Sequence, residues 1–190
     1  EDNTEYYVLI PSPAFDDVDS NSYAGIHDGI PNFKTTLSFT TTNTIPTLTS
    51  SVPGDNATGV ALNANIVLTF SEIVNVESGN ITIHKTSDDS DDPPVETIDV
   101  TGSQVTGNGS TEITINPGTD FEDNTEYYVL IPNTAFDDVD SGSYAGIPSD
   151  TEALSFTTTN TIPTLTSSVP ADDAIDVERD ANIILNFSEN

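Results

Sequence analysis

Residues 65–71 read N-I-V-L-T-F-S, and this short stretch decides the fold class. Its large apolar side chains, Ile66, Leu68 and Phe70, alternate with smaller β-branched ones. Successive side chains of a β-strand point to opposite faces of a sheet, so this period of two predicts a strand with one face buried in a core.

Runs of the same kind continue along the chain on either side. They are separated by Gly, Pro, Asn and Asp, and none has the sustained 3.6-residue period of a helix. The strands predicted between residues 44 and 160 are 47–53 with a continuation at 60–62, 65–71, 80–84, 95–100, 112–116, 126–131 and 154–157. About seven short strands in one domain predict an all-β fold, an Ig-like β-sandwich.

The chain repeats itself at the spacing of one domain. Residues 1–11 (EDNTEYYVLIP) recur unchanged at 122–132, and residues 45–53 (IPTLTSSVP) recur at 162–170. A period this long indicates one domain per repeat and not a solenoid, whose period is about 20–50 residues. We therefore expect three parts: the C-terminal part of one repeat (1–43), a complete repeat (44–160) and the N-terminal part of the next (161–190).

The charge of the chain excludes several classes of partner. It has 32 acidic residues against 3 basic ones, for a net charge of −29. Nothing here can neutralise the phosphates of a nucleic acid, and an anionic membrane surface repels such a chain. No apolar run approaches the ~18 residues of a membrane helix, so we expect no membrane insertion. Cysteine is absent, so disulfides do not stabilise the fold.

Several motifs follow one another in order along the complete repeat. They are T-S-S-V-P-x-D (49–55), N-A-N-I-V-L-T-F-S-E (63–72), N-T-E-Y-Y-V-L-I (124–131), A-F-D-D (135–138) and L-S-F-T-T-T (154–159). In this order they resemble the bacterial Ig-like domains of S-layer proteins and large surface adhesins. The resemblance implies a two-sheet sandwich used as a repeating extracellular spacer.

Two further features indicate structural roles. Tyr6 and Tyr127 lie near the start of the penultimate strand of their repeats, where a tyrosine of an Ig-like domain commonly hydrogen-bonds to an upstream backbone group. The linker 39–46 (FTTTNTIP) contains no glycine. Threonine is stiff at χ1 and proline fixes φ, so this linker predicts a rod and not flexibly tethered domains.

The strongest candidate for a binding site is an acidic loop before the last strand of each repeat. The first copy of this loop contains Asp16, Asp17, Asp19 and Asn21, and the second contains Asp137, Asp138 and Asp140. The D-x-D-x-N spacing from residue 17 opens many calcium loops, because alternate side chains bring hard oxygen atoms to one ion. The match to an EF-hand ends there, and Gly142 replaces Asn21 in the second copy. The sequence therefore leaves open two interpretations, a Ca²⁺ site and a solvated loop with internal hydrogen bonds.

Topology adds further candidate ligands. In such a sandwich the loop between the second and third strands lies at the same end as the acidic loop. We expect that loop to begin at Ser71-Glu72, with Glu189 at the same position in the next repeat. Glu72 then approaches Asp137, Asp138 and Asp140 at the end where the linker enters. Crowded carboxylates repel one another, so a Ca²⁺ ion there would stiffen the joint to the preceding domain.

These observations favour a structural, non-enzymatic extracellular module of a stalk or fibre. Its expected partners are neighbouring repeats in the same or adjacent chains, and a glycan or cell-surface ligand is expected only through domains outside this chain. One alternative is a self-assembling filament joined by strand complementation, in which residues 1–43 supply last strands and 161–190 first ones. Another is a carbohydrate-binding or linker module of a secreted polysaccharide-degrading enzyme, which requires exposed aromatic side chains in a groove.

Overall fold

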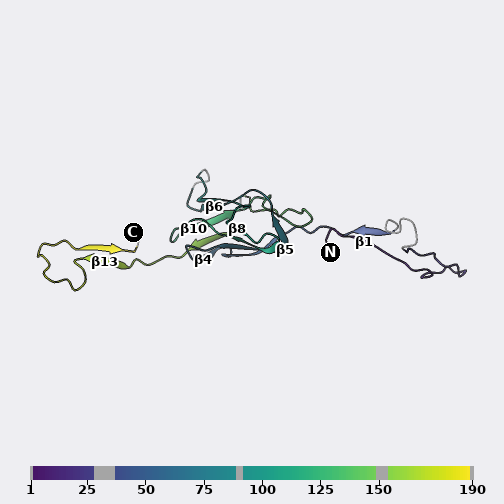
Figure 1. Cartoon of the computed structure of the whole chain (residues 1–190), viewed down its shortest axis with the longest axis horizontal. Helices are drawn as coiled ribbons and strands as arrows, with labels where there is room; N and C mark the ends of the chain where they lie inside the picture. Colours follow the sequence, from purple (N-terminus) through teal and green to yellow (C-terminus); the bar gives the residue numbers. More distant parts are fainter. Residues whose placement is uncertain (1, 28–36, 89–91, 149–153, 189–190) are drawn as a thin grey trace.

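The computed structural model describes residues 2–27, 37–88, 92–148 and 154–188, and regular secondary structure in this part of the chain is all β. Figure 1 shows three parts in a row: a ribbon that includes β1, a sandwich, and a hairpin that includes β13. In chain order the strands are β1 (Glu5–Tyr7), β2 (Ser38–Thr40), β3 (Leu48–Val52), β4 (Ala57–Val60), β5 (Ile66–Val76), β6 (Asn80–Lys85), β7 (Glu96–Asp99), β8 (Val105–Thr106), β9 (Ser110–Ile115), β10 (Glu126–Leu130), β11 (Phe136–Asp137), β12 (Ser155–Thr158), β13 (Leu165–Val169) and β14 (Ile184–Phe187).

The middle part is a sandwich of two sheets. One sheet has the strand order β4-β12-β10-β6-β7. The other has the order β11-β5-β9-β8, and β3 also pairs with β5. Neighbouring strands in the described residues run antiparallel, except that β4 runs parallel to β12. The prediction of an all-β sandwich is confirmed.

The predicted alternation places the core correctly. On β5, Ile66, Leu68 and Phe70 are buried between the sheets. The inward residues of the other predicted strands are also buried: Ile81, Ile83, Ile113, Ile115, Tyr127, Val129, Ile131, Leu154 and Phe156. Each such side chain contributes roughly 1.5–3 kcal/mol on burial, so these inward faces hold the two sheets together.

The predicted tyrosine bond is present in the complete repeat. The hydroxyl oxygen of Tyr127 accepts a hydrogen bond from the backbone N–H of Glu122, five residues upstream, at 2.8 Å. The ring itself is buried and packs against Phe121 and Phe156. Tyr127 therefore fixes the approach to β10 and has a structural role.

The strand predicted at 60–62 is placed differently in the structure. It lies at 57–60 as β4, which leaves the sheet of β3 and pairs with β12 in the other sheet. The preceding turn explains the crossing, because Asn56 has a φ of 58° and redirects the chain. The turn is then held to β12 by the N–H of Asn56, which donates to the carbonyl of Ser155 at 2.8 Å.

The predicted end of the second strand is wrong. We expected a loop from Ser71, but β5 continues to Val76, so Glu72 lies within a strand. The charge at Glu72 interrupts the apolar alternation, and the pairing with β9 shifts register between Thr69 and Val74. Val74 is again buried, so the strand resumes its place in the core.

The outer parts repeat the pairing of the sandwich. Tyr6 pairs with Phe39 in β1 and β2, as Tyr127 pairs with Phe156 in β10 and β12. Likewise β13 and β14 repeat the pairing of β3 and β5. Most core-type residues are exposed in these parts, although Ile26 is buried. Phe15 is 62% exposed, whereas its counterpart Phe136 is fully buried.

Candidate joint between repeats

The acidic loop of the complete repeat is built around one buried carboxylate. We call residues 132–147 the tip loop and residues 11–26 its first copy. One oxygen of Asp138, Oδ1, accepts hydrogen bonds from the backbone N–H groups of Asp140 (2.7 Å) and Gly142 (2.8 Å). Asp138 is only 4% exposed, so these bonds offset the cost of burying its charge. The carboxylate thereby fixes the shape of the loop.

Strand pairing places this loop beside the far end of β5. In β11, Phe136 and Asp137 pair with Val76 and Asn75. The ring of Phe136 packs against Phe70, which packs in turn against Tyr144 from the end of the loop. The tip loop is therefore anchored to the core, and it lies at the same end of the sandwich as Glu72.

The linker from the preceding part contacts the tip loop directly. The side-chain amide of Asn43 donates from Nδ2 to Oδ2 of Asp138 at 3.0 Å. The hydroxyl of Thr44 lies 3.4 Å from Oε1 of Glu72 on β5. Two adjacent linker residues thus contact two acidic side chains of the complete repeat.

The same linker also bonds to the part that precedes it. The carboxylate of Asp2 accepts hydrogen bonds from the backbone N–H of Thr44, at 3.2 Å, and from its hydroxyl. These bonds hold the pKa of Asp2 below its usual value. The linker that follows the complete repeat makes the same contact, because Oδ1 of Asp123 accepts a hydrogen bond from the N–H of Thr161 at 2.8 Å.

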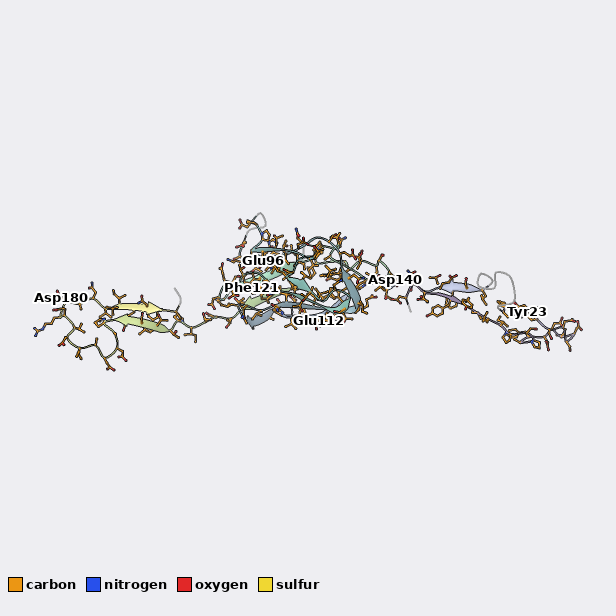
Figure 2. The ribbon with its side chains drawn as sticks, in the orientation of Figure 1. Tyr23, Glu96, Glu112, Phe121, Asp140 and Asp180 are labelled. Atoms are coloured by element: carbon orange, nitrogen blue, oxygen red, sulfur yellow. The ribbon has the colours of Figure 1, made fainter. Side chains whose placement is uncertain are left out.

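Negative charge gathers where the linker meets the sandwich. Partial burial of Glu72, followed by the negative charges of Asp138 and Asp2, raises the pKa of the Glu72 carboxyl. A smaller contribution in the same direction comes from Asp140. Figure 2 shows Asp140 at the end of the sandwich that faces the first part of the chain. The joint therefore has a local excess of negative charge.

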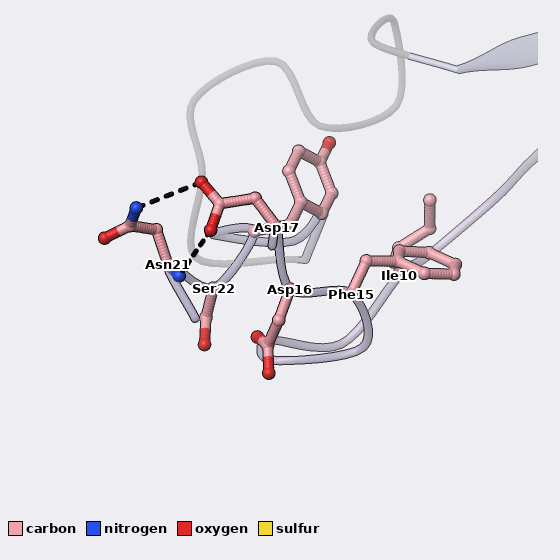
Figure 3. A pocket seen from close by; sticks show the side chains of 7 residues that line it. Ile10, Phe15, Asp16, Asp17, Asn21 and Ser22 are labelled. Carbon is pink, nitrogen blue, oxygen red and sulfur yellow. Dashed lines mark hydrogen bonds between the residues drawn. The ribbon is translucent and has the colours of Figure 1, made fainter. Parts of the chain in front are cut away.

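The first copy of the acidic loop has a similar fold but lies elsewhere. Tyr23, a residue of this copy, lies at the end of the first part that is remote from the sandwich (Figure 2). Its Asp17 accepts hydrogen bonds from the N–H groups of Asp19 (2.9 Å) and Asn21 (2.8 Å), and from Nδ2 of Asn21 at 3.0 Å (Figure 3). The bonds from Asn21 lower the pKa of Asp17. Asn21 thus presents its amide nitrogen to the carboxylate, unlike the ligand of a calcium loop, which would present an oxygen.

A hollow of about 530 Å³ lies beside this first copy. Apolar side chains of Ile10, Phe15 and Tyr23 form part of its lining, together with Asp16 and Asp17 (Figure 3). In the complete repeat the residues equivalent to Phe15 and Tyr23 are Phe136 and Tyr144, and both pack against Phe70. The hollow therefore corresponds to the place that a phenylalanine of β5 occupies in the complete repeat.

A family model described as a bacterial Ig-like domain matches residues 42–158, more than half of the chain. The chain belongs to the bacterial Ig-like domain family. This confirms the resemblance drawn from the ordered motifs, and the family points to a structural domain and not to an enzyme. No curated protein matches the chain.

A solved structure also resembles this bacterial Ig-like chain. It is the crystal structure of the S-layer protein rSbsC(31-844), which is 14% identical with a TM-score of 0.39. The match covers 74% of this chain and 19% of that one, so the present chain spans about a fifth of its length. In the described part of the Ig-like chain, no helix is long and apolar enough to cross a membrane.

The structure brings together only some of the predicted ligands. Glu72 lies close enough to Asp138 and Asp140 for their charges to raise its pKa, as the topology predicted. Asp137 is held in β11 beside Asn75. The ligands predicted in the first copy lie in a loop that is remote from the joint: Asp16, Asp17, Asp19 and Asn21. Glu189 lies outside the described residues. Within the described ranges, no three His, Cys, Asp or Glu side chains form a ready-made metal-binding group.

Sequence reasoning missed three residues of the joint, Asp2, Asn43 and Thr44. One signal for them was available, because the pair Asp2 and Thr44 recurs as Asp123 and Thr161 in the second copy. The repeat of this pair does not by itself indicate a contact, because the two residues are far apart in sequence and only the fold shows that they meet. The aromatic groove of the carbohydrate-binding alternative is absent from the described residues of the complete repeat: Tyr128 is half-buried and stacked on His84 at 4.9 Å, and the other aromatic rings are buried.

Proposed function

We propose that this chain is a structural, non-enzymatic part of an extended extracellular stalk on a bacterial surface protein. The observation that carries the proposal is the joint, where Asp2 bonds the linker to the preceding part and Asp138 bonds it to the complete repeat. A linker held on both sides transmits the orientation of one domain to the next. A glycine- or serine-rich linker would instead leave the domains free to reorient.

Small-angle X-ray scattering from the whole chain tests the stalk directly. A stalk predicts an elongated particle whose greatest dimension is the same from low to high protein concentration. A scattering profile that requires a broad mixture of bent and straight conformers would contradict it.

We further propose that Ca²⁺ stiffens this joint. The donors are oxygen atoms of the kind that Ca²⁺ prefers: carboxylates of Glu72, Asp138, Asp140 and Asp2, and the side-chain carbonyl of Asn43. Because the Asp138 carboxylate offers acceptors alone, Asn43 turns its nitrogen toward it and its Oδ1 away. That Oδ1 is buried and has no hydrogen-bond partner among the described residues. A buried acceptor without a partner, in a negatively charged joint, fits a cation.

A bound Ca²⁺ ion would supply charge neutralisation at the joint. Asp138 and Asn43 would supply oxygen ligands to the ion, because each retains unused lone pairs. Glu72 and Asp140 would have to move toward Asp138, since the described side chains form no ready-made cluster. The first copy of the loop, with Asp17 bonded internally, does not belong to this site.

Thermal unfolding of the whole chain in calcium and in chelator tests whether Ca²⁺ binds the folded chain. The ionic strength is held fixed, and magnesium is the control. Calcium at 100 times its dissociation constant should add about 2.7 kcal/mol to the free energy of unfolding. The variants Glu72→Gln and Asp2→Asn should reduce that gain, and they leave the loop-forming bonds of Asp138 intact. An unchanged midpoint, or an equal rise in magnesium, would remove calcium from the proposal and leave the linker contacts as the source of stiffness.

A second candidate is a filament of chains joined by strand complementation. Phe15 and Tyr23 line the hollow of Figure 3, and Phe187 on β14, the counterpart of Phe70, is exposed. The β13–β14 hairpin of a second copy would place Phe187 against Phe15 and Tyr23. It ranks second because such a pair contains no counterpart of β6, β7, β8 or β9. Electron microscopy distinguishes the two candidates: regular fibres that disappear in Phe187→Ala support the filament, and single particles at all concentrations exclude it.

A further inference from the structure

The two copies of the tip loop use the same aspartate in the same way. Asp17 and Asp138 each accept two backbone N–H groups on Oδ1, from the residues two and four positions further along. The shape of the loop is therefore set by the aspartate in both copies. It does not depend on whether the residue four positions on is Asn21 or Gly142.

The copies differ in what satisfies the second oxygen. Oδ2 of Asp17 accepts a side-chain amide from Asn21 of its own loop at 3.0 Å (Figure 3). Oδ2 of Asp138 accepts a side-chain amide from Asn43 of the incoming linker, also at 3.0 Å. One carboxamide thus replaces the other at the same chemical position.

Gly142 makes room for the linker. A Cβ atom at this position would lie 2.5 Å from Oδ2 of Asp138 and 2.6 Å from Nδ2 of Asn43. Both distances are far below ordinary contact, so any side chain there displaces the amide of Asn43. The backbone itself permits a side chain, because neither Gly142 nor Asn21 has a left-handed φ.

We propose that the residue four positions after the loop aspartate decides whether a tip loop binds the linker of the preceding repeat. With glycine, as at Gly142, the loop leaves Oδ2 of the aspartate open to the linker asparagine. With asparagine, as at Asn21, the loop occupies that oxygen itself and is closed to the linker. The proposal rests on the proposed function in one respect, that neighbouring repeats are joined end to end.

The partner that this loop recognises is defined by its chemistry. It is a carboxamide on an extended, glycine-free linker, because a carboxylate binds an amide donor and a stiff chain holds that donor in place. Both linkers of this chain contain it in the same sequence, T-T-T-N-T-I-P, as Asn43 and Asn160. The linkers are thus alike and the loops differ, so the loop residue determines which joints are held.

Nuclear magnetic resonance of the whole chain tests this assignment. In the wild type, the backbone of Asn43 should be as ordered as the strands, and its side-chain amide should exchange slowly with water. Gly142→Asn should release the linker, with the order of Asn43 falling and its amide exchange rising by roughly fivefold, as expected for loss of one hydrogen bond. Gly142→Asn and Asn43→Ala should each lower the backbone order at Thr44 by the same amount. The double variant should lower it no further than either single variant.

Matched variants separate the assignment from damage to the fold. Gly142→Asn should keep the thermal midpoint, because asparagine satisfies Asp138 as Asn21 satisfies Asp17. Gly142→Ala should release the linker and lower the midpoint, because it displaces Asn43 and donates nothing. Asn21→Gly, in the first copy, should leave Asn43 unchanged. An ordered Asn43 with a slowly exchanging amide in Gly142→Asn would overturn the inference alone, whereas a disordered Asn43 in the wild type would overturn both it and the stiff stalk.

Discussion

At the scale of single residues, this Ig-like repeat depends on a few buried groups that satisfy one another. Asp138 shows the pattern, because each of its carboxylate oxygens accepts hydrogen bonds that shape the loop or hold the linker. Tyr127 shows it in the core, where a buried ring directs a polar oxygen to a backbone N–H. Burying such a group costs little free energy when it is paired, and removing one partner destabilises the fold.

The first residue-scale prediction concerns the tyrosine bond. Tyr127→Phe removes the oxygen that accepts the N–H of Glu122 and keeps the buried ring, so we expect a loss of about 1 kcal/mol in the free energy of unfolding. Urea denaturation measures it. Tyr128→Phe on the outward face is the matched control, and equal losses in the two variants would show that the bond contributes nothing specific.

The second prediction uses the repeat as its own control. Phe136 is fully buried and packs against Phe70, so Phe136→Ala should cost about 3–5 kcal/mol. The same change at the exposed Phe15 should have a much smaller effect on the unfolding of the sandwich. The thermal midpoints of the two variants provide the comparison, and a small effect at Phe136 would mean that β11 is not anchored as described.

At the scale of elements, alternation in the sequence predicted the strands that line the core and failed where alternation stops. Residues 65–71 alternate without a break, but Glu72 places a charge at the next inward position and conceals the continuation of β5. The strands β8 and β11 have two residues each, too few to show a period. The tip-loop aspartates were found from their spacing, whereas Asn43 and Asp2 belong to the site only because the fold brings the linker to the loop.

The stability of the joint should depend on pH through Glu72, which lies on β5. Its pKa is raised in the folded chain, so the folded state binds a proton more readily than the unfolded state, and stability is lost as pH rises from about the ordinary value of 4.5. Asp2, whose pKa is lowered, contributes stability above the ordinary aspartate range that is lost as pH falls. We therefore expect Glu72→Gln to be more stable than the wild type at neutral pH, with the difference vanishing in acid.

Thermal midpoints across a pH series in chelator measure this difference. Glu112→Gln, an exposed glutamate on β9, is the control for removing one unit of negative charge from a chain at −29. A Glu72→Gln variant that is less stable than the wild type at neutral pH would show that the negative charge at the joint is already compensated.

At the scale of the whole molecule, the bacterial Ig-like repeat is a unit that contacts a linker at each of its two ends. Its acidic tip loop faces the preceding part (Figure 2), and at its other end the carboxylate of Asp123 bonds the outgoing linker. The same pair of contacts can therefore recur at each joint whose tip loop has glycine at the position of Gly142, which suits the proposed stalk. We expect the joint to hold neighbouring parts in one orientation.

A distance measurement between two spin labels, one on each side of the joint, tests this expectation. The chain has no cysteine, so labels can be attached to cysteines introduced at Ser38 on β2 and Thr58 on β4 without background labelling. Both positions are exposed, and β4 pairs with β12, the strand that leads into the outgoing linker at the end remote from the joint. Pulsed electron resonance should give one narrow distance distribution in calcium, which broadens when Asn43 is replaced by alanine. A broad distribution in the unaltered joint, in calcium and in chelator alike, would contradict the stiff stalk.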